Sequence, residues 1–213
     1  MTQICHRLHH LFAECPKSGF PFDRRAIPRN GIYVLFETGE LAHGVDRIVR
    51  VGTHTGNNQL PSRLEQHFVK ENKDRSIFRK NIGRAILNRD KDPFLEQWEI
   101  DLTTDEAKRK YAGVISPQIL QETERRVTEY MQRNLRFGVF RVDDKAQRLG
   151  WESKIISTVS LCTECRPSAT WLGLDSPKVK IRESGLWLVN ELYKEPLSVS
   201  DFDAVKQVAL GKW

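Results

Sequence analysis

Short runs of apolar and β-branched residues predict the strands of this protein. Gly31–Glu37 and Arg47–Gly52 are two such runs joined by a connection that contains glycine, which is typical of an antiparallel strand pair. Phe137–Val142 predicts a third strand of the same kind. Polar and apolar residues also alternate in Phe94–Leu102, which predicts a further strand.

Apolar positions spaced three and four residues apart predict helices in much of the remaining chain. Pro61 suits the first turn of one helix, because the N–H that proline lacks would be unpaired there in any case. Thr103 and Glu106 resemble a capping box at the start of a short helix. The longer predicted helices are Leu60–Val69, Ser76–Leu87, Pro117–Asn134, Ala146–Leu161 and Asp201–Leu210.

The order of these elements predicts an α+β fold, in which helices flank a small three-stranded antiparallel sheet. A length of 213 residues suits one domain. Prolines interrupt residues 1–30, so we expect an N-terminal extension there, followed by a single domain over residues 31–213. After Pro167 we expect a C-terminal tail that is irregular until the final helix, Asp201–Leu210.

The composition is that of a globular protein, with 39% hydrophobic and 29% charged residues. No apolar run approaches the length of a membrane span, and histidines stand where a signal peptide would need apolar residues. We therefore expect a cytoplasmic protein that does not enter a membrane.

Positive charge is concentrated in one part of the chain. The formal net charge is +6, and residues 60–91 carry nine Lys or Arg against four acidic residues, a net charge of +5. A basic stretch of this kind is typical of a surface that binds the DNA backbone, although a solvated helix face has the same composition. The residues assigned to DNA binding on this ground are Lys70, Lys73, Arg79 and Lys80.

Four cysteines are too few for a disulfide scaffold at this length, so reduced thiols are expected. Cys162 and Cys165 form a CxxC pair that could bind zinc only if further ligands joined it. Cys5, Cys15 and one of the histidines 6, 9 or 10 could do so if the two ends of the chain meet. Buried thiols are the simpler interpretation, and a zinc-stabilised interaction protein remains an alternative.

Candidate catalytic residues lie on five predicted elements that follow one another along the chain. Gly31-Ile32-Tyr33 lies on the first strand and Arg50-Val51-Gly52 ends the second. Arg63 and His67 follow on a helix, and Glu152 lies on a helix after the third strand. In this order the five elements resemble the GIY-YIG nucleases, and in particular their type II restriction endonuclease members. The resemblance spans about residues 31–160 and implies insertions around residues 70–135.

The resemblance implies a catalytic role for each of these side chains. Tyr33 would accept a proton, but a free tyrosine has a pKa near 10, so a cation would have to favour its ionisation. Arg50 stands where the family usually has tyrosine and could supply that cation or hold a phosphate. Arg63 and His67 share a helix face, where Arg63 would stabilise the transition state and His67 would orient Tyr33 or relay its proton.

Glu152 would hold one Mg²⁺ ion, for which Mn²⁺ could substitute. An ion pair with Arg148, four residues earlier, is the alternative role for this carboxylate. Asn190, in a tail segment similar to that of the restriction enzymes, would contact the scissile phosphate; the alternative there is a packed tryptophan pair. His54 and Asn57 lie in a loop that could meet DNA.

Together these features predict a metal-dependent endonuclease that hydrolyses double-stranded DNA, in a restriction or defence role. A homodimer would match the two-fold symmetry of a palindromic site. The alternative is a DNA-binding module that has kept the fold and lost the activity.

Overall fold

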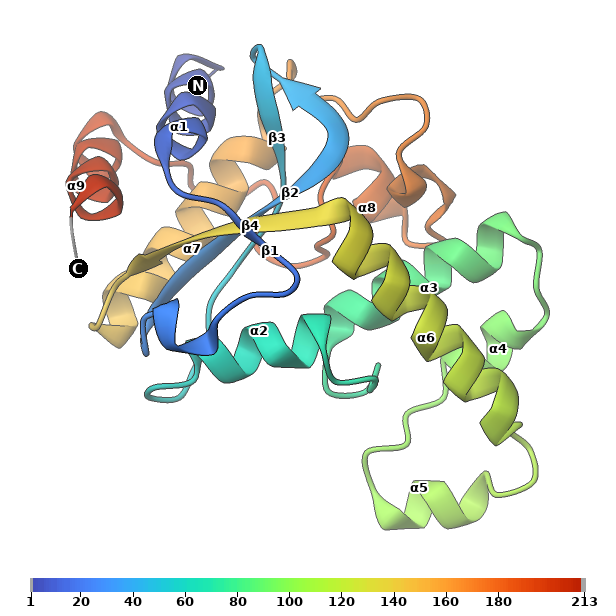
Figure 1. The fold of residues 1–213 in the computed structure, drawn as a ribbon. Coiled ribbons are helices and arrows are strands. Elements are labelled where there is room, and N and C mark those ends of the chain that lie inside the picture. The colour runs from blue at the N-terminus through green and yellow to red at the C-terminus, as the bar shows by residue number, and fades with distance from the viewer. Residues whose placement is uncertain (1, 212–213) are drawn as a thin grey trace.

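The computed structural model describes residues 2–211, and its centre is a four-stranded antiparallel sheet with the strand order β1-β4-β2-β3 (Figure 1). The strands are β1 (Ser18–Gly19), β2 (Gly31–Ala42), β3 (Val45–Gly52) and β4 (Leu135–Arg141). The predicted α+β class is therefore right, but the predicted three strands are joined by a fourth. The added strand β1 has only two residues and pairs with the outer edge of β4, so it leaves no periodic pattern to recognise.

Strands β2 and β3 form a hairpin whose turn consists of His43 and Gly44. Both residues have positive φ angles, 53° and 80°, as the tight turns of β-hairpins require. Further along the hairpin, Leu35 pairs with Arg50 while the next residue, Phe36, pairs with Ile48. Val49 is thus an extra residue in β3, and this bulge changes the direction of the side chains that follow it.

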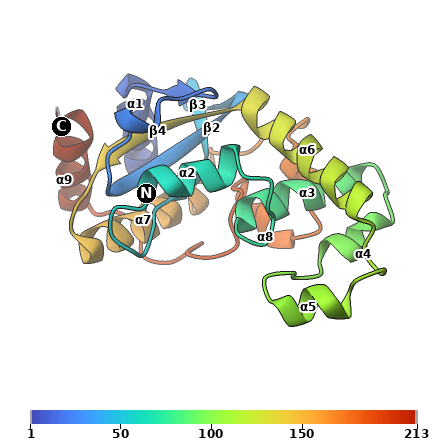
Figure 2. The same ribbon diagram turned by 60° about the horizontal axis from the view of Figure 1, so that its bottom comes forward.

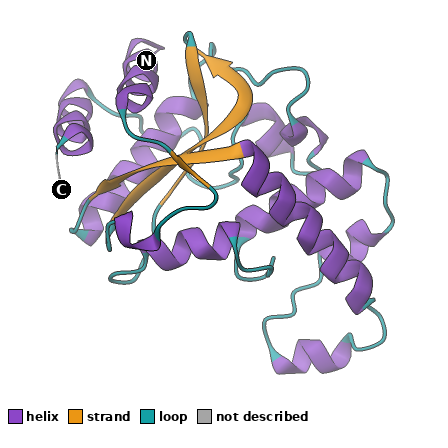
Figure 3. Cartoon of the chain, viewed as in Figure 1, coloured by secondary structure: helices purple, strands orange, loops and turns teal. Residues whose placement is uncertain are grey.

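Helices cover both faces of the sheet, which explains why nearly every residue at the start of β2 is buried. Alternate side chains such as Ile32 and Val34 face a core formed with three helices. These are α1 (Thr2–Glu14), α7 (Lys145–Ser160) and α9 (Val199–Leu210), which are among the purple helices around the orange sheet in Figure 3. This layer brings the two ends of the chain together, because α1 contacts α9.

The opposite face packs against the middle of the chain, as the second view shows (Figure 2). Tyr33 and Leu35 lie in this second core. Its helices are α2 (Leu60–Phe68), α3 (Ile77–Arg89), α4 (Phe94–Trp98), α6 (Pro117–Asn134) and α8 (Val179–Ser184), with the short helix α5 (Asp105–Lys110) at the far end.

The five longer predicted helices are confirmed, with ends that differ by at most three residues. The predicted strand Phe94–Leu102 is wrong. Phe94 and Trp98 are spaced four residues apart and are both buried on the short helix α4, where Trp98 lies against Gly83 of α3. The predicted short helix exists, but Thr104 rather than Thr103 caps it.

The segment expected to form an N-terminal extension contains a helix, α1, that is part of the core. Helix α1 buries Cys5, Leu8, Leu11 and Phe12 against the sheet and α9. The prolines that suggested an irregular arm fall after this helix, around β1 and a short 3₁₀ helix (Arg24–Ala26).

None of the helices within residues 2–211 combines the length and apolar character needed to cross a membrane.

Candidate active site

The site begins where β2 and β3 lie side by side. Tyr33 pairs directly with Gly52, and its side chain is fully buried. The ring crosses the glycine so closely that a Cβ atom at residue 52 would lie 2.2 Å from the tyrosine hydroxyl. Gly52 is therefore required for the position of Tyr33, because any larger residue would push the phenol out of place.

The Tyr33 hydroxyl forms a hydrogen bond with His67 on α2. The oxygen lies 2.9 Å from His67 Nε2, and His67 Nδ1 lies 2.8 Å from the hydroxyl oxygen of Ser76, which caps α3. Burial, assisted by the nearby Arg63, holds the pKa of His67 well below its usual value. His67 is therefore neutral at physiological pH and can exchange a proton with the phenol through Nε2.

Arg50 brings a cation to the same phenol. Its Nε lies 3.4 Å from the Tyr33 hydroxyl, and its Nη1 donates to the Trp187 carbonyl at 2.5 Å. The guanidinium also stacks 4.7 Å from the centre of the Phe78 ring. The bulge at Val49 places Arg50 opposite Leu35, on the Tyr33 side of the sheet. The predicted proximity of Arg50 to Tyr33 is thus confirmed.

Glu152 approaches from α7 and meets the end of β3. Its Oε1 accepts the backbone N–H of Thr53 at 3.0 Å. Burial raises the pKa of this carboxyl to about 6, while the positive charge of Arg50 opposes the shift. Glu152 is consequently ionised at neutral pH but close to its titration range.

A pocket of about 390 Å³ opens beside this carboxylate and is bordered by the loop after β3, by α2 and by α7. Arg63 lines it and is held by Gln66 Oε1 at 3.0 Å and by the Arg75 carbonyl at 3.2 Å. Thr53, His54, Gln59 and Glu152 also line this pocket. Arg63 and Glu152 thus face the same pocket, while Tyr33 and His67 are fully buried and do not line it.

The donor set of this pocket fits a hydrated Mg²⁺ ion. Glu152 supplies a carboxylate and the threonine hydroxyls and glutamine amides supply neutral oxygens, which suits a cation that keeps several waters and binds through one or two carboxylates. His54 Nδ1 lies 2.7 Å from the Gly56 carbonyl, and His54 Nε2 is buried without a partner in the described structure. That free nitrogen is available to a water on the ion or to a substrate group.

Arg148 does not form the ion pair with Glu152 that was the alternative role for this carboxylate, and it has a structural role instead. The buried guanidinium donates to the carbonyls of His54, Gly56 and Asp143, at 3.2, 2.9 and 2.9 Å. It therefore fixes the loop that carries His54. His54 is only 5% exposed, so it belongs to the pocket wall and not to an open DNA-reading loop, whereas Asn57 is exposed.

Asn190 is exposed and does not join the lining of the pocket. Its neighbour Glu191 accepts a bond from Ser153, next to Glu152. The alternative for this tail, a packed tryptophan pair, is confirmed: the rings of Trp171 and Trp187 are centred 4.9 Å apart.

Both indoles donate to one buried carboxylate oxygen, Glu37 Oε2, at 2.9 Å each. Glu37 was not singled out in the sequence. The sequence feature that could have identified Glu37 is its position as an acidic residue at the end of the apolar run of β2.

The predicted basic DNA-binding stripe is largely wrong. Lys73, Arg79 and Lys80 are all buried. Arg79 pairs with Glu124 of α6 at 2.7 Å, and Lys73 and Lys80 donate to carbonyls of the segment after α4. Lys70 is exposed. The three buried cations therefore bind α3 and the turn before it to α6 and to the segment after α4, and they do not form an exposed basic surface.

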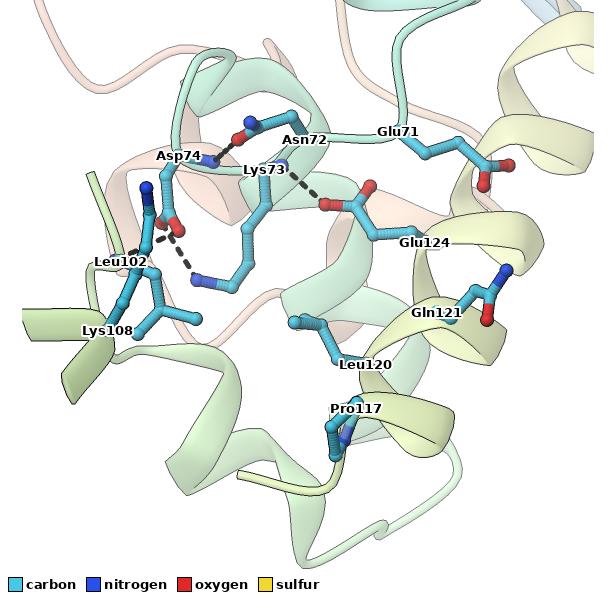
Figure 4. A pocket seen from close by; sticks show the side chains of 10 residues that line it. All are labelled: Glu71, Asn72, Lys73, Asp74, Leu102, Lys108, Pro117, Leu120, Gln121 and Glu124. Atoms are coloured by element: carbon cyan, nitrogen blue, oxygen red, sulfur yellow. Dashed lines mark hydrogen bonds and ion pairs between the residues drawn. The ribbon is translucent and has the colours of Figure 1, made fainter. Parts of the chain in front are cut away.

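Lys73 and Glu124 also border a second pocket, between the turn before α3 and α6 (Figure 4). Its lining includes Asp74 and Leu120, which extend toward the same space as Lys73. None of the motif residues lines it, so the chemistry of this protein is expected at the end of β3.

The buried pair leads to a prediction about stability. Arg79→Ala removes the cation that is paired with the buried Glu124 and the hydrogen bond from Arg79 Nη1 to the His67 carbonyl. The free energy of unfolding in denaturant is expected to fall by about 3–5 kcal/mol. The control Lys70→Ala is expected to change it by less than about 0.5 kcal/mol. If Arg79→Ala left the stability unchanged and weakened DNA binding, Arg79 would belong to a DNA-binding surface as first predicted.

A family model described as a GIY-YIG domain matches residues 19–209, which is most of the chain. No curated protein and no solved structure matched the chain.

Proposed function

Since this chain belongs to the GIY-YIG family, whose fold is of the nuclease type, we propose that it is a metal-dependent endonuclease acting on double-stranded DNA. One observation carries the proposal. The Tyr33–His67 pair, the Arg50 guanidinium and the Glu152 carboxylate meet where β3 ends, and Arg63 and Glu152 open onto the same pocket.

In this proposal the reaction is the attack of a water molecule on a phosphodiester. Neutral His67 takes up the phenol proton through Nε2, and the phenolate that this leaves accepts the proton of the attacking water. Arg50 stabilises the phenolate that forms. The phenol is enclosed in the DNA-free protein, so DNA binding has to bring the attacking water to it.

Arg63 binds the phosphate and stabilises the extra negative charge of the transition state. Its anchors, Gln66 and the Arg75 carbonyl, hold the guanidinium toward the pocket. Glu152 would hold the divalent ion, with Thr53 fixing the carboxylate. A bound Mg²⁺ ion supplies Lewis-acid stabilisation of the departing 3′ oxygen.

The proposal also includes cleavage at a specific DNA site and a role in restriction or defence. The protein would act as a homodimer whose two-fold symmetry matches a palindromic site. Exposed Asn57 could then read base edges beside the pocket, and Asn190 could contact the phosphate from the exposed tail. The alternative function, an inactive DNA-binding module, would need the same fold. The intact Tyr33–His67 pair favours the enzyme, because a binding module has no use for a buried proton-transfer pair.

A comparison of substrates tests this function. Equal amounts of duplex DNA, single-stranded DNA and duplex RNA are incubated with the protein and Mg²⁺, and both cleavage and binding are measured. Discrete fragments from duplex DNA alone are expected. Tight, salt-sensitive binding of duplex DNA without cleavage would instead establish the binding module.

The pKa of Glu152 gives a further prediction for the pH profile. The ionised carboxylate is the form that binds a cation, and burial raises its pKa to about 6. Cleavage at limiting Mg²⁺ is therefore expected to fall below pH 6, approaching about tenfold per pH unit. More Mg²⁺ should move the inflection to lower pH, because the ion competes with the proton. A profile that does not respond to Mg²⁺ would exclude Glu152 as the titrating ligand.

A further inference from the structure

A second cluster of chemically active side chains lies on the other side of the sheet. Cys5 and His9 come from α1, His43 from the β2–β3 turn, and Cys165 from the segment after α7. Their potential ligand atoms all lie within 4.8 Å of one another. The two ends of the chain thus do meet, as a zinc site of this kind requires, although the ligand set differs from the predicted candidates.

We propose that Cys5, His9, His43 and Cys165 form a structural zinc site. With Zn–S bonds of about 2.3 Å and Zn–N bonds of about 2.0–2.1 Å, a tetrahedral ion needs ligand atoms roughly 3.3–3.8 Å apart. Cys5 Sγ lies 3.3 Å from Cys165 Sγ, and His43 Nε2 lies 3.2 Å from Cys165 Sγ. His9 Nε2 lies 3.9 Å from Cys165 Sγ. These distances are close to the edges of such a tetrahedron.

The second nitrogen of each histidine already has the partner that a zinc ligand requires. His9 Nδ1 lies 3.0 Å from the Cys5 carbonyl, and His43 Nδ1 lies 3.5 Å from a carboxylate oxygen of Glu164. Zinc-binding histidines usually donate their other N–H to a carbonyl or carboxylate, which leaves the second nitrogen for the metal. His9 Nε2 also lies 3.2 Å from the Ile48 amide, an interaction that zinc would replace.

Burial and charge fit zinc as well. Cys5 and His9 are fully buried, Cys165 is 3% exposed and the His43 side chain is 2% exposed. Two thiolates neutralise one Zn²⁺ ion, so the filled site would carry no net charge into the interior. The two thiol protons leave on binding. Four protein ligands leave no open position, which is typical of structural and not of catalytic zinc.

A disulfide is the competing explanation for Cys5 and Cys165. Their sulfur atoms are 3.3 Å apart, well beyond the roughly 2.05 Å of an S–S bond, and both cysteines are free. Cys162 Sγ lies 3.6 Å from His43 Nε2, one of the proposed ligand atoms. Cys162 is therefore the alternative fourth ligand, in place of His9.

The proposed zinc would tie together the parts of the chain that support the candidate active site. Helix α7 carries Glu152, and the β2–β3 hairpin carries Tyr33 and Arg50. The ligands come from α1, from the turn of that hairpin and from the segment directly after α7. Zinc would therefore stabilise this arrangement without touching the reacting atoms.

Elemental analysis of the purified protein and of four variants tests the site without DNA. The wild type is expected to contain about one zinc per chain. Cys165→Ser should lose it, and Cys15→Ser should retain it. Cys15 is a suitable control, because it is buried at the end of α1 but bonds to carbonyls of Leu11 and Ala209 outside the cluster. Zinc-free wild type, zinc-loaded Cys165→Ser or a Cys5–Cys165 disulfide would overturn the proposal.

His9→Ala and Cys162→Ser distinguish the ligand sets. Loss of zinc from His9→Ala and retention in Cys162→Ser are expected, and the reverse would overturn the set proposed here. If Cys165→Ser fails to fold, wild type produced with Co²⁺ gives an independent readout. Thiolate-to-cobalt charge-transfer bands and the visible bands of tetrahedral Co²⁺ are expected, and octahedral Co²⁺ without thiolate bands would contradict the site.

Discussion

Glu152→Gln is expected to reduce DNA cleavage by more than about 10³-fold while DNA binding stays within about threefold of wild type. The substitution keeps the size of the side chain and an oxygen that can accept the Thr53 N–H, but it removes the charge that would hold Mg²⁺. Metal stabilisation of a transition state amounts to several kcal/mol, and each 1.36 kcal/mol is about tenfold in rate. Single-turnover cleavage and equilibrium binding to the same duplex measure the two effects.

Glu191→Gln is the matched control for this prediction. Glu191 lies close enough to Glu152 to affect its pKa, but its carboxylate is bound to Ser153 and Lys194. Cleavage within about threefold of wild type is expected for this variant. If Glu191→Gln were the inactive protein and Glu152→Gln the active one, the metal ligand would have been placed on the wrong carboxylate.

Tyr33→Phe is expected to lower the cleavage rate by about 10²- to 10⁴-fold, the usual contribution of a general base. The change removes only the hydroxyl, and the ring keeps its place over Gly52. His67 Nε2 loses its partner in the interior, so a loss of about 1–3 kcal/mol in stability is also expected. Cleavage is therefore compared at a temperature where denaturant unfolding shows both proteins fully folded.

His67→Gln separates catalysis from positioning. An amide at residue 67 can still bond to the Tyr33 hydroxyl but cannot carry the transferred proton. A rate reduced as far as in Tyr33→Phe would support proton transfer through the pair. A rate near wild type would mean that His67 only holds the phenol in position, and a fully active Tyr33→Phe would remove Tyr33 from the chemistry.

Much of the fold follows from local patterns in the sequence. Helix α6 begins and ends at the predicted residues, because Ser116 caps it, Pro117 opens it and buried Val127 and Met131 lie four residues apart. The failure at Phe94–Leu102 has a local cause too. Phe94 and Trp98 satisfy a helical spacing as well as an alternating one, and the match of Trp98 to Gly83 comes from tertiary packing.

The proximity of Tyr33, Arg50 and His67 could be predicted because the residues lie on adjacent elements in the order that the family shares. The error in the basic stripe arose because charge composition does not report burial. Arg79 is paired with Glu124, forty-five residues away, and no local pattern connects them. For the same reason the histidine from the β2–β3 turn, His43, could not be assigned to the cysteine cluster, since its position depends on where the hairpin meets α1.

Metal-dependent cleavage tests the central claim most directly. Wild type and Glu152→Gln are desalted into buffer without divalent ions, which should leave a closed zinc site filled, and a mixed set of duplex DNAs is then added with or without Mg²⁺. We expect discrete fragments only from wild type with Mg²⁺. Equal cleavage with and without Mg²⁺, or equal cleavage by the two proteins, would contradict a nuclease that acts through a metal on Glu152.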